Sequence, residues 1–277
     1  MLVVTPPLVI FDTMIFTDAA SGALGKASQT AISPADWAKV TNYVNRTYVH
    51  AATPATVVEL LTSLGNADRK YFSEQCVRLR KLQQSFSNTI FLNWVRYFIR
   101  TEVFGLEANM DSEIEYNLRN VINLVLNSSS KEDAFGKVRF TQLAAQRQAH
   151  RDDWQRQLAV LQSLDKPAKG QFRLDHDGWA AMKLGELNIE VNDANRAVFQ
   201  GRLDCMYHME NRILELAQNP SWNTEKIQNF IFDQNQTAYL GAEGAIFVTR
   251  DNEILDAAEN SIQKDRVFSW TDFLAQC

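Results

Sequence analysis

The chain has 277 residues, 45% of them hydrophobic and 22% charged, with a formal net charge of −5. This is the composition of a globular protein, and it excludes disordered and fibrous chains and proteins that coat nucleic acid by bulk positive charge. The start, MLVVTPPLVIFD, lacks the basic leader of a signal peptide, and no apolar run is long enough for a membrane helix. The three cysteines are scattered and form no disulfide framework or zinc motif. We therefore expect a cytoplasmic protein without a membrane span.

The first 65 residues read as alternating strands and helices. The apolar run of residues 8–12 predicts a buried strand. Ser33-Pro34 and Thr53-Pro54 each combine an N-cap residue with proline at the first helical position, which predicts a helix after each pair. Apolar residues then recur at helical spacing in both segments: Trp37, Val40 and Val44 in the first, and Val57, Leu61 and Leu64 in the second.

The middle of the chain, residues 66–186, has helical apolar spacing almost throughout. It holds 18 basic and 15 acidic residues, whereas the remainder holds 10 basic and 18 acidic ones. We interpret it as a mainly helical insertion, with one of its helices around Trp154 and Leu158. Asp175-His176-Asp177 is expected to be a surface loop, because the four histidines show no paired metal-binding spacing.

Strands and helices alternate again in residues 187–277. Short strands are predicted at residues 245–249 and 266–269, with a weaker candidate at 187–191, and a helix capped by Asn223 or Thr224 precedes them. Strands separated by helices are typical of an α/β fold with a parallel sheet. We therefore expect a discontinuous α/β core formed by residues 1–65 and 187–277.

Four acids are placed so that they could converge. Asp12 and Asp251 end predicted strands, and Glu59 and Asp233 lie beside the apolar stripes of predicted helices. The carboxyl ends of parallel strands line one crevice, and clustered carboxylates there suit Mg²⁺ or Mn²⁺. Each acid also has a plain structural role open to it: Asp12 and Asp251 as helix N-caps, Glu59 as a solvated residue, and Asp233 as part of the polar run that continues through residues 234–236.

These motifs together resemble the PIN-domain ribonucleases. The pieces are VIFDT, TPATVVELL, and an aspartate 18 residues before the one in FVTRD, followed by NEILDAA, the short strand RVFS and the helix WTDFL. The resemblance covers residues 7–65 and 187–277, and the polar run after Asp233 and the long middle segment depart from the family pattern. It implies a PIN-like α/β fold in which Asp12, Glu59, Asp233 and Asp251 are the metal-binding acids, supported by Thr13, Thr249 and Glu253.

By this resemblance, the function expected is Mg²⁺- or Mn²⁺-dependent hydrolysis of RNA, single-stranded in the first instance. Two alternatives stay open: a catalytically inactive PIN-like binding or assembly module, and a structure-specific nuclease acting on DNA. A homodimer, or a protein partner bound through the insertion, is also open. Basic residues beside aromatic ones make Arg78, Arg80 and Lys81 candidate RNA contacts, and Arg250 is a fourth candidate. The same pattern also fits a helix whose aromatic residues are buried and whose charged residues are exposed to solvent.

Other chemistries fit the sequence less well. A haloacid-dehalogenase phosphatase needs a second aspartate two residues after Asp12, where Met14 stands. The segment SGALGK lacks the first glycine of a phosphate-binding loop and the hydroxyl residue after Lys26. No serine elbow or catalytic-cysteine motif is present.

Overall fold

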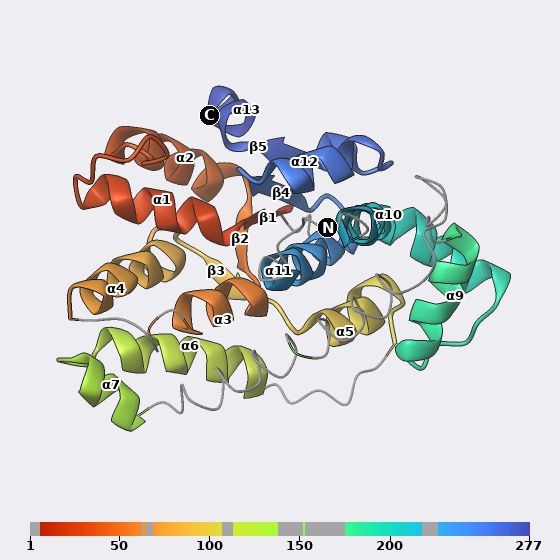
Figure 1. Ribbon diagram of the computed structural model, residues 1–277, viewed down its shortest axis with the longest axis horizontal. Coiled ribbons are helices and arrows are strands. Elements are labelled where there is room, and N and C mark those ends of the chain that lie inside the picture. Colours follow the sequence, from red (N-terminus) through yellow and green to blue (C-terminus); the bar gives the residue numbers. More distant parts are fainter. Residues whose placement is uncertain are drawn as a thin grey trace, which may run out of the picture.

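Five parallel strands form one sheet in the order β3-β2-β1-β4-β5 (Figure 1). The computed structural model describes residues 6–62, 64, 69–106, 113–137, 152, 175–217 and 227–277. The strands are β1 (Leu8–Phe11), β2 (Val49–Ala52), β3 (Thr89–Phe91), β4 (Ile246–Thr249) and β5 (Val267–Ser269). The predicted α/β class with a parallel sheet is thereby confirmed.

Helices connect the strands and cover both faces of the sheet (Figure 1). Before β3 they are α1 (Thr13–Ala23), α2 (Pro34–Thr47), α3 (Pro54–Thr62) and α4 (Arg69–Gln84). Between β3 and β4 the described helical elements are α5 (Val95–Phe98), η2 (Ile99–Val103), α6 (Glu113–Leu126), α7 (Lys131–Lys137), α9 (His176–Glu186), α10 (Asp193–Ala217), α11 (Ile227–Thr237) and η4 (Ala238–Gly241). The chain ends with α12 (Asn252–Glu259), η5 (Lys264–Arg266) and α13 (Trp270–Gln276).

The alternation of side chains along each strand produces two hydrophobic cores. On β1, Val9 and Phe11 point into the core shared with α1, α2, α4 and α13, whereas Ile10 points into the core shared with α9, α10 and α12. On β4, Val248 and Phe247 divide in the same way. Because both faces are covered, β1 (LVIF) and the first three residues of β4 (IFV) are apolar, as the sequence pattern indicates.

The sheet register aligns the ends of the central strands. Phe11 pairs with Val248, and the backbone N–H of Asp12 donates to the carbonyl of Val248 at 3.0 Å. Residues that follow β1 and β4 therefore emerge side by side at one edge of the sheet.

Local signals in the sequence predicted several elements correctly. Ser33 caps α2, its side chain accepting a hydrogen bond from the N–H of Asp36 at 3.0 Å, and the hydroxyl of Thr53 accepts one from the N–H of Thr56 at 3.1 Å. The strands predicted near residues 8–12, 245–249 and 266–269 are confirmed as β1, β4 and β5.

Two expectations are wrong within the described residues. The expectation of a mainly helical middle segment is a separate matter, since its described residues are mainly helical and also contribute β3 to the sheet. Residues 187–191 form a turn after α9 in place of a strand, with Asn188 at a φ of 53°. Asp175-His176-Asp177 begins α9 in place of a loop, because Asp175 accepts the N–H of Gly178 at 2.9 Å and caps the helix.

Other expectations concern residues that the structure does not describe. The helix predicted around Trp154 and Leu158, and the cap at Asn223 or Thr224, lie outside the described residues. Among the helices that are described, none is long and apolar enough to cross a membrane.

Candidate functional site

Asp12 lies at the junction between β1 and α1, and its side chain is 3% exposed. One carboxylate oxygen accepts the hydroxyl of Thr249 at 2.8 Å, and the other faces the N–H of Met14 at 3.4 Å. Asp12 therefore does cap the helix that follows it. The same contacts fix the carboxylate at the edge of the sheet between β1 and β4.

Glu59 reaches the first turn of α1 from α3. The hydroxyl of Thr13, the residue after Asp12, donates to its carboxylate at 2.5 Å. This hydrogen bond joins residues 46 positions apart in the chain. It holds the side chain of Glu59 next to the backbone that carries Asp12.

Thr249 and Asp251 form a compact turn after β4. The hydroxyl of Thr249 accepts the N–H of Asp251 at 2.9 Å while it donates to Asp12. Asp251 in turn caps α12 by accepting the N–H of Glu253 at 2.7 Å. One hydroxyl thus connects the two acids that end β1 and β4.

Asp233 extends from α11, the helix whose polar run departs from the family pattern. Two neighbouring polar residues are buried: Gln234 donates to Glu210 of α10 at 2.5 Å, and the amide oxygen of Gln236 accepts the hydroxyl of Thr56 at 3.3 Å, whereas the amide nitrogen of Gln236 has no partner among the described residues. Glu210 also accepts the indole N–H of Trp179 at 2.8 Å. These contacts anchor α11 between α10 and α3 and set the direction of Asp233.

Asp233 lies within electrostatic range of Asp12, Glu59 and Asp251, and Asp12 lies within range of Asp251. Burial raises the pKa of Asp12 to about 6, the hydrogen bond from Thr249 lowers it, and the charge of Asp251 raises it. Burial also raises the pKa of Asp233 well above its usual range, and the charges of Asp12, Glu59 and Asp251 add to this shift. Acids from four separate elements therefore converge at one edge of the sheet.

Asp233 is the least compensated of these acids. Its side chain is 7% exposed, and the described residues offer its carboxylate no hydrogen bond or ion pair. A buried carboxylate among like charges is stabilised by a proton or by a cation. The chemistry of the surrounding donors, which are carboxylates and hydroxyls, matches that of the oxygen ligands that Mg²⁺ and Mn²⁺ take.

The acids nevertheless do not form a closed ligand set. In the part of the chain that the structure describes, no three histidine, cysteine, aspartate or glutamate side chains are grouped so that they could hold a metal ion as they stand. A cation would have to draw the carboxylates closer together. The residue types are those that bind divalent cations, whereas the described arrangement of these side chains is not that of a metal site.

Glu253 is engaged in an ion pair. Its carboxylate accepts the Nε–H of Arg212, on α10, at 2.7 Å. Glu253 was expected among the supporting acids, whereas no pattern in the sequence points to Arg212. This pair neutralises Glu253, so its carboxylate is a weaker candidate ligand than the four other acids.

The predicted basic contacts are dispersed. Arg250 donates to Asp18 of α1 at 2.8 Å and to the backbone carbonyl of Thr30, and its guanidinium lies 5.7 Å from the ring centroid of Trp270. No pattern in the sequence indicates Asp18 as the partner of Arg250. Its one distinguishing feature in the sequence is that it is a charged residue within the mainly apolar segment of α1.

The three basic candidates of α4 differ in their surroundings. Burial lowers the pKa of Arg78, opposed by the charge of Glu74. Lys81 lies 5.6 Å from the ring centroid of Trp37, and Arg80 is exposed. These positions leave Arg80 the most accessible of the three to an external ligand.

Comparison with known proteins adds no assignment: no family model, no curated protein and no solved structure matches this chain.

Proposed function

We propose that this protein is a divalent-metal-dependent ribonuclease with a PIN-like core. The observation that carries the proposal is the convergence of Asp12, Glu59, Asp233 and Asp251 from four separate elements, where burial and then the like charges of the other three acids raise the pKa of Asp233. Acids held together in this way are unfavourable for stability unless they bind a proton or a cation. The motif resemblance, which runs through the same residues, supports RNA as the substrate.

We assign different roles to the four acids. Asp12 and Asp251, fixed by the shared hydroxyl of Thr249, would be the principal ligands of Mg²⁺ or Mn²⁺. Glu59 and Asp233 would complete the set or orient water. When bound, the cation supplies a Lewis acid that activates water and offsets the negative charge developing on the phosphoryl group.

One experiment tests this proposal. Purified protein is incubated with labelled single-stranded RNA in Mg²⁺ or Mn²⁺, with EDTA, and as the Asp12→Asn variant. We expect cleavage only by the wild type with metal. The matched control is Asp175→Asn, an exposed helix cap outside the site, which should cleave normally.

A second function is favoured by one observation, the absence of a preformed three-ligand group among the described residues. A PIN-like module that binds partners without cleaving RNA would need no such group. Wild-type protein that shows neither metal-dependent cleavage nor a metal-dependent shift in melting temperature would support that function. Cleavage of single-stranded DNA but not RNA of the same sequence would instead identify a deoxyribonuclease.

A further inference from the structure

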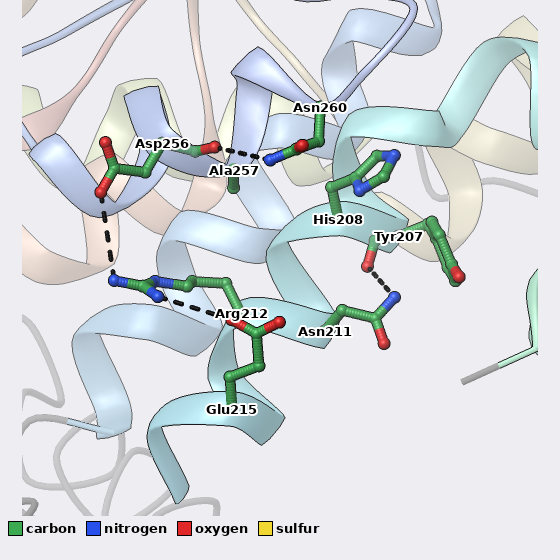
Figure 2. Close-up of a pocket in the computed structure, with 8 residues that line it drawn as sticks. All are labelled: Tyr207, His208, Asn211, Arg212, Glu215, Asp256, Ala257 and Asn260. Carbon is green, nitrogen blue, oxygen red and sulfur yellow. Dashed lines mark hydrogen bonds and ion pairs between the residues drawn. The ribbon is translucent and has the colours of Figure 1, made fainter. Parts of the chain in front are cut away.

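A polar pocket of about 220 Å³ lies between α10 and α12 (Figure 2). Its lining includes Arg212, Asn211 and His208 from α10, and Asp256 and Asn260 from α12 and its end. This volume lies below the roughly 300–1,000 Å³ of most small-molecule sites. It suits a single planar ring system better than a whole nucleotide.

Arg212 is held tightly at its Nε and more loosely at its two terminal nitrogens. Its Nε–H donates to Glu253 at 2.7 Å, whereas its two terminal nitrogens lie 3.5 Å from Glu215 and 4.0 Å from Asp256. The contacts of the terminal nitrogens are longer than good charged hydrogen bonds, which are about 2.7–2.9 Å. Figure 2 shows these nitrogens between the two carboxylates. The guanidinium is therefore oriented by Glu253 and presents its terminal N–H groups to the pocket.

Asp256 supplies an acceptor beside this fork. Its side chain is 65% exposed, and Arg212 is its only side-chain partner among the described residues, at 4.0 Å. Asn260 donates its amide N–H to the backbone carbonyl of Asp256 at 3.3 Å. The amide oxygen of Asn260 takes no part in this hydrogen bond and is a second acceptor at the pocket. The pocket thus places donors and acceptors side by side.

The charges select the kind of ligand. A phosphate or carboxylate approaching Arg212 would meet Glu215 and Asp256, and a simple cation would meet the guanidinium. A neutral ring with two adjacent acceptors next to two adjacent donors avoids both conflicts. Guanine has this pattern: O6 and N7 accept the two N–H groups of an arginine fork, and N1–H and the 2-amino group can donate to one carboxylate.

We propose that this pocket binds a guanine base, with Arg212 on O6 and N7 and Asp256 on N1–H and the 2-amino group. The proposal rests on the proposed function for its biological meaning, because it makes the pocket the base-recognition subsite of an RNA-cleaving enzyme. Adenine, cytosine and uracil each lack a ring N–H beside an exocyclic amino group, so none of them offers the paired donors.

Helix α12 connects the pocket to the acid site. Asp251 caps its first turn, and Asp256 lies five residues further on, about 8 Å along the axis at 1.5 Å per residue. Glu253, which anchors Arg212, lies between them. A guanine in the pocket would therefore belong to a nucleotide close to the phosphodiester that the acids face, and the enzyme would cut at a fixed short distance from guanine.

The test uses free nucleosides, so that it does not depend on cleavage. Guanosine, adenosine, cytidine and uridine are titrated into the full chain in EDTA and followed by ligand-observed NMR. We expect guanosine to bind about tenfold more tightly than the others, the discrimination that one bidentate pair supplies. Arg212→Lys keeps the positive charge but removes the fork, and Asp256→Ala removes the exposed acceptor, so each should abolish the preference.

The matched control is Arg196→Lys, the same substitution elsewhere on α10, which should leave guanosine binding unchanged. Equal binding of the four nucleosides, or unchanged guanosine preference in both Arg212→Lys and Asp256→Ala, would overturn the proposal. The two proposals also fail separately. Guanosine selectivity without cleavage would remove only the ribonuclease, and RNA cleavage without guanosine selectivity would remove only the pocket.

Discussion

Replacing Asp12 with asparagine should stabilise the metal-free protein at neutral pH. Burial raises the pKa of this carboxyl from 3.8 to about 6. The unfolded chain therefore loses its proton more readily than the folded one, and the folded protein loses stability as the pH rises from about 3.8 to about 6. At 1.36 kcal/mol per pKa unit, the cost at pH 7.5 is about 3 kcal/mol.

Asparagine removes this cost but keeps only part of the hydrogen bonding. Its amide oxygen can accept either the Thr249 hydroxyl or the N–H of Met14, and the lost bond offsets about 1 kcal/mol. The net gain is about 2 kcal/mol, or roughly 4–8 °C in melting temperature for a protein of this size. The gain should disappear below about pH 4, where Asp12 is protonated in both states.

The assay is thermal and urea unfolding in EDTA at pH 7.5 and at pH 4. Asp175→Asn is the matched control, because it makes the same change at an exposed helix cap, and Asn and Asp cap equally well. With saturating Mn²⁺ the order should reverse, since a ligand at 100 times its Kd adds about 2.7 kcal/mol to the wild type. Asp12→Asn that is less stable than the wild type at pH 7.5 in EDTA would refute the reasoning.

Three further predictions concern the surroundings of the site and the core. Burial lowers the pKa of His50 to about 3, so the wild type should lose roughly 1.4 kcal/mol per pH unit below about pH 6.5, and His50→Phe should flatten this acid limb in urea titrations from pH 7 to 4. A Cβ at Gly22 would lie 1.7 Å from the backbone oxygen of Ile32, so Gly22→Ala should lower the melting temperature. A Cβ at Gly185 meets nothing within 4 Å, so Gly185→Ala should raise the free energy of unfolding by roughly 0.5–1 kcal/mol. Thr249→Val removes both hydrogen bonds of the shared hydroxyl and should cost about 1–3 kcal/mol in chemical denaturation and reduce RNA cleavage; unchanged values in both assays would contradict its bridging role.

Local signals in the sequence were sufficient for the elements that begin with a cap or consist of an apolar run. Asp12 and Asp251 fulfil the capping role open to each of them and also face the other acids, because a cap uses one carboxylate oxygen and leaves the other free for a second contact. The two roles were compatible, so the sequence pattern could not separate them.

Strands β2 and β3 were not predicted from the sequence. Both are short, and their strand conformation depends on pairing with neighbouring strands more than on their own residues. Residues 89–91 follow a helical apolar stripe, and only pairing with β2 makes them a strand. Strand β2 itself contains His50 and two alanines, which are weak strand formers. Pairing between distant segments outweighed local preference there.

Side-chain partners far apart in the chain were the least predictable part of the site. The pairing of Arg212 with Glu253 and of Arg250 with Asp18 depends on how α10 and α1 pack, and no local spacing signals it. The same holds for the polar residues after Asp233. They appear unfavourable in a packed helix until Glu210 and Thr56 are seen to bond them.

The most direct test of the account is a crystal grown with Mn²⁺ and measured at the manganese absorption edge. We expect an anomalous peak from a manganese ion bound by carboxylate oxygens of Asp12 and Asp251, with Asp233 or Glu59 drawn toward it. A well-ordered edge of the sheet with no peak there, or a manganese ion bound only elsewhere, would contradict the claim that these acids share a cation.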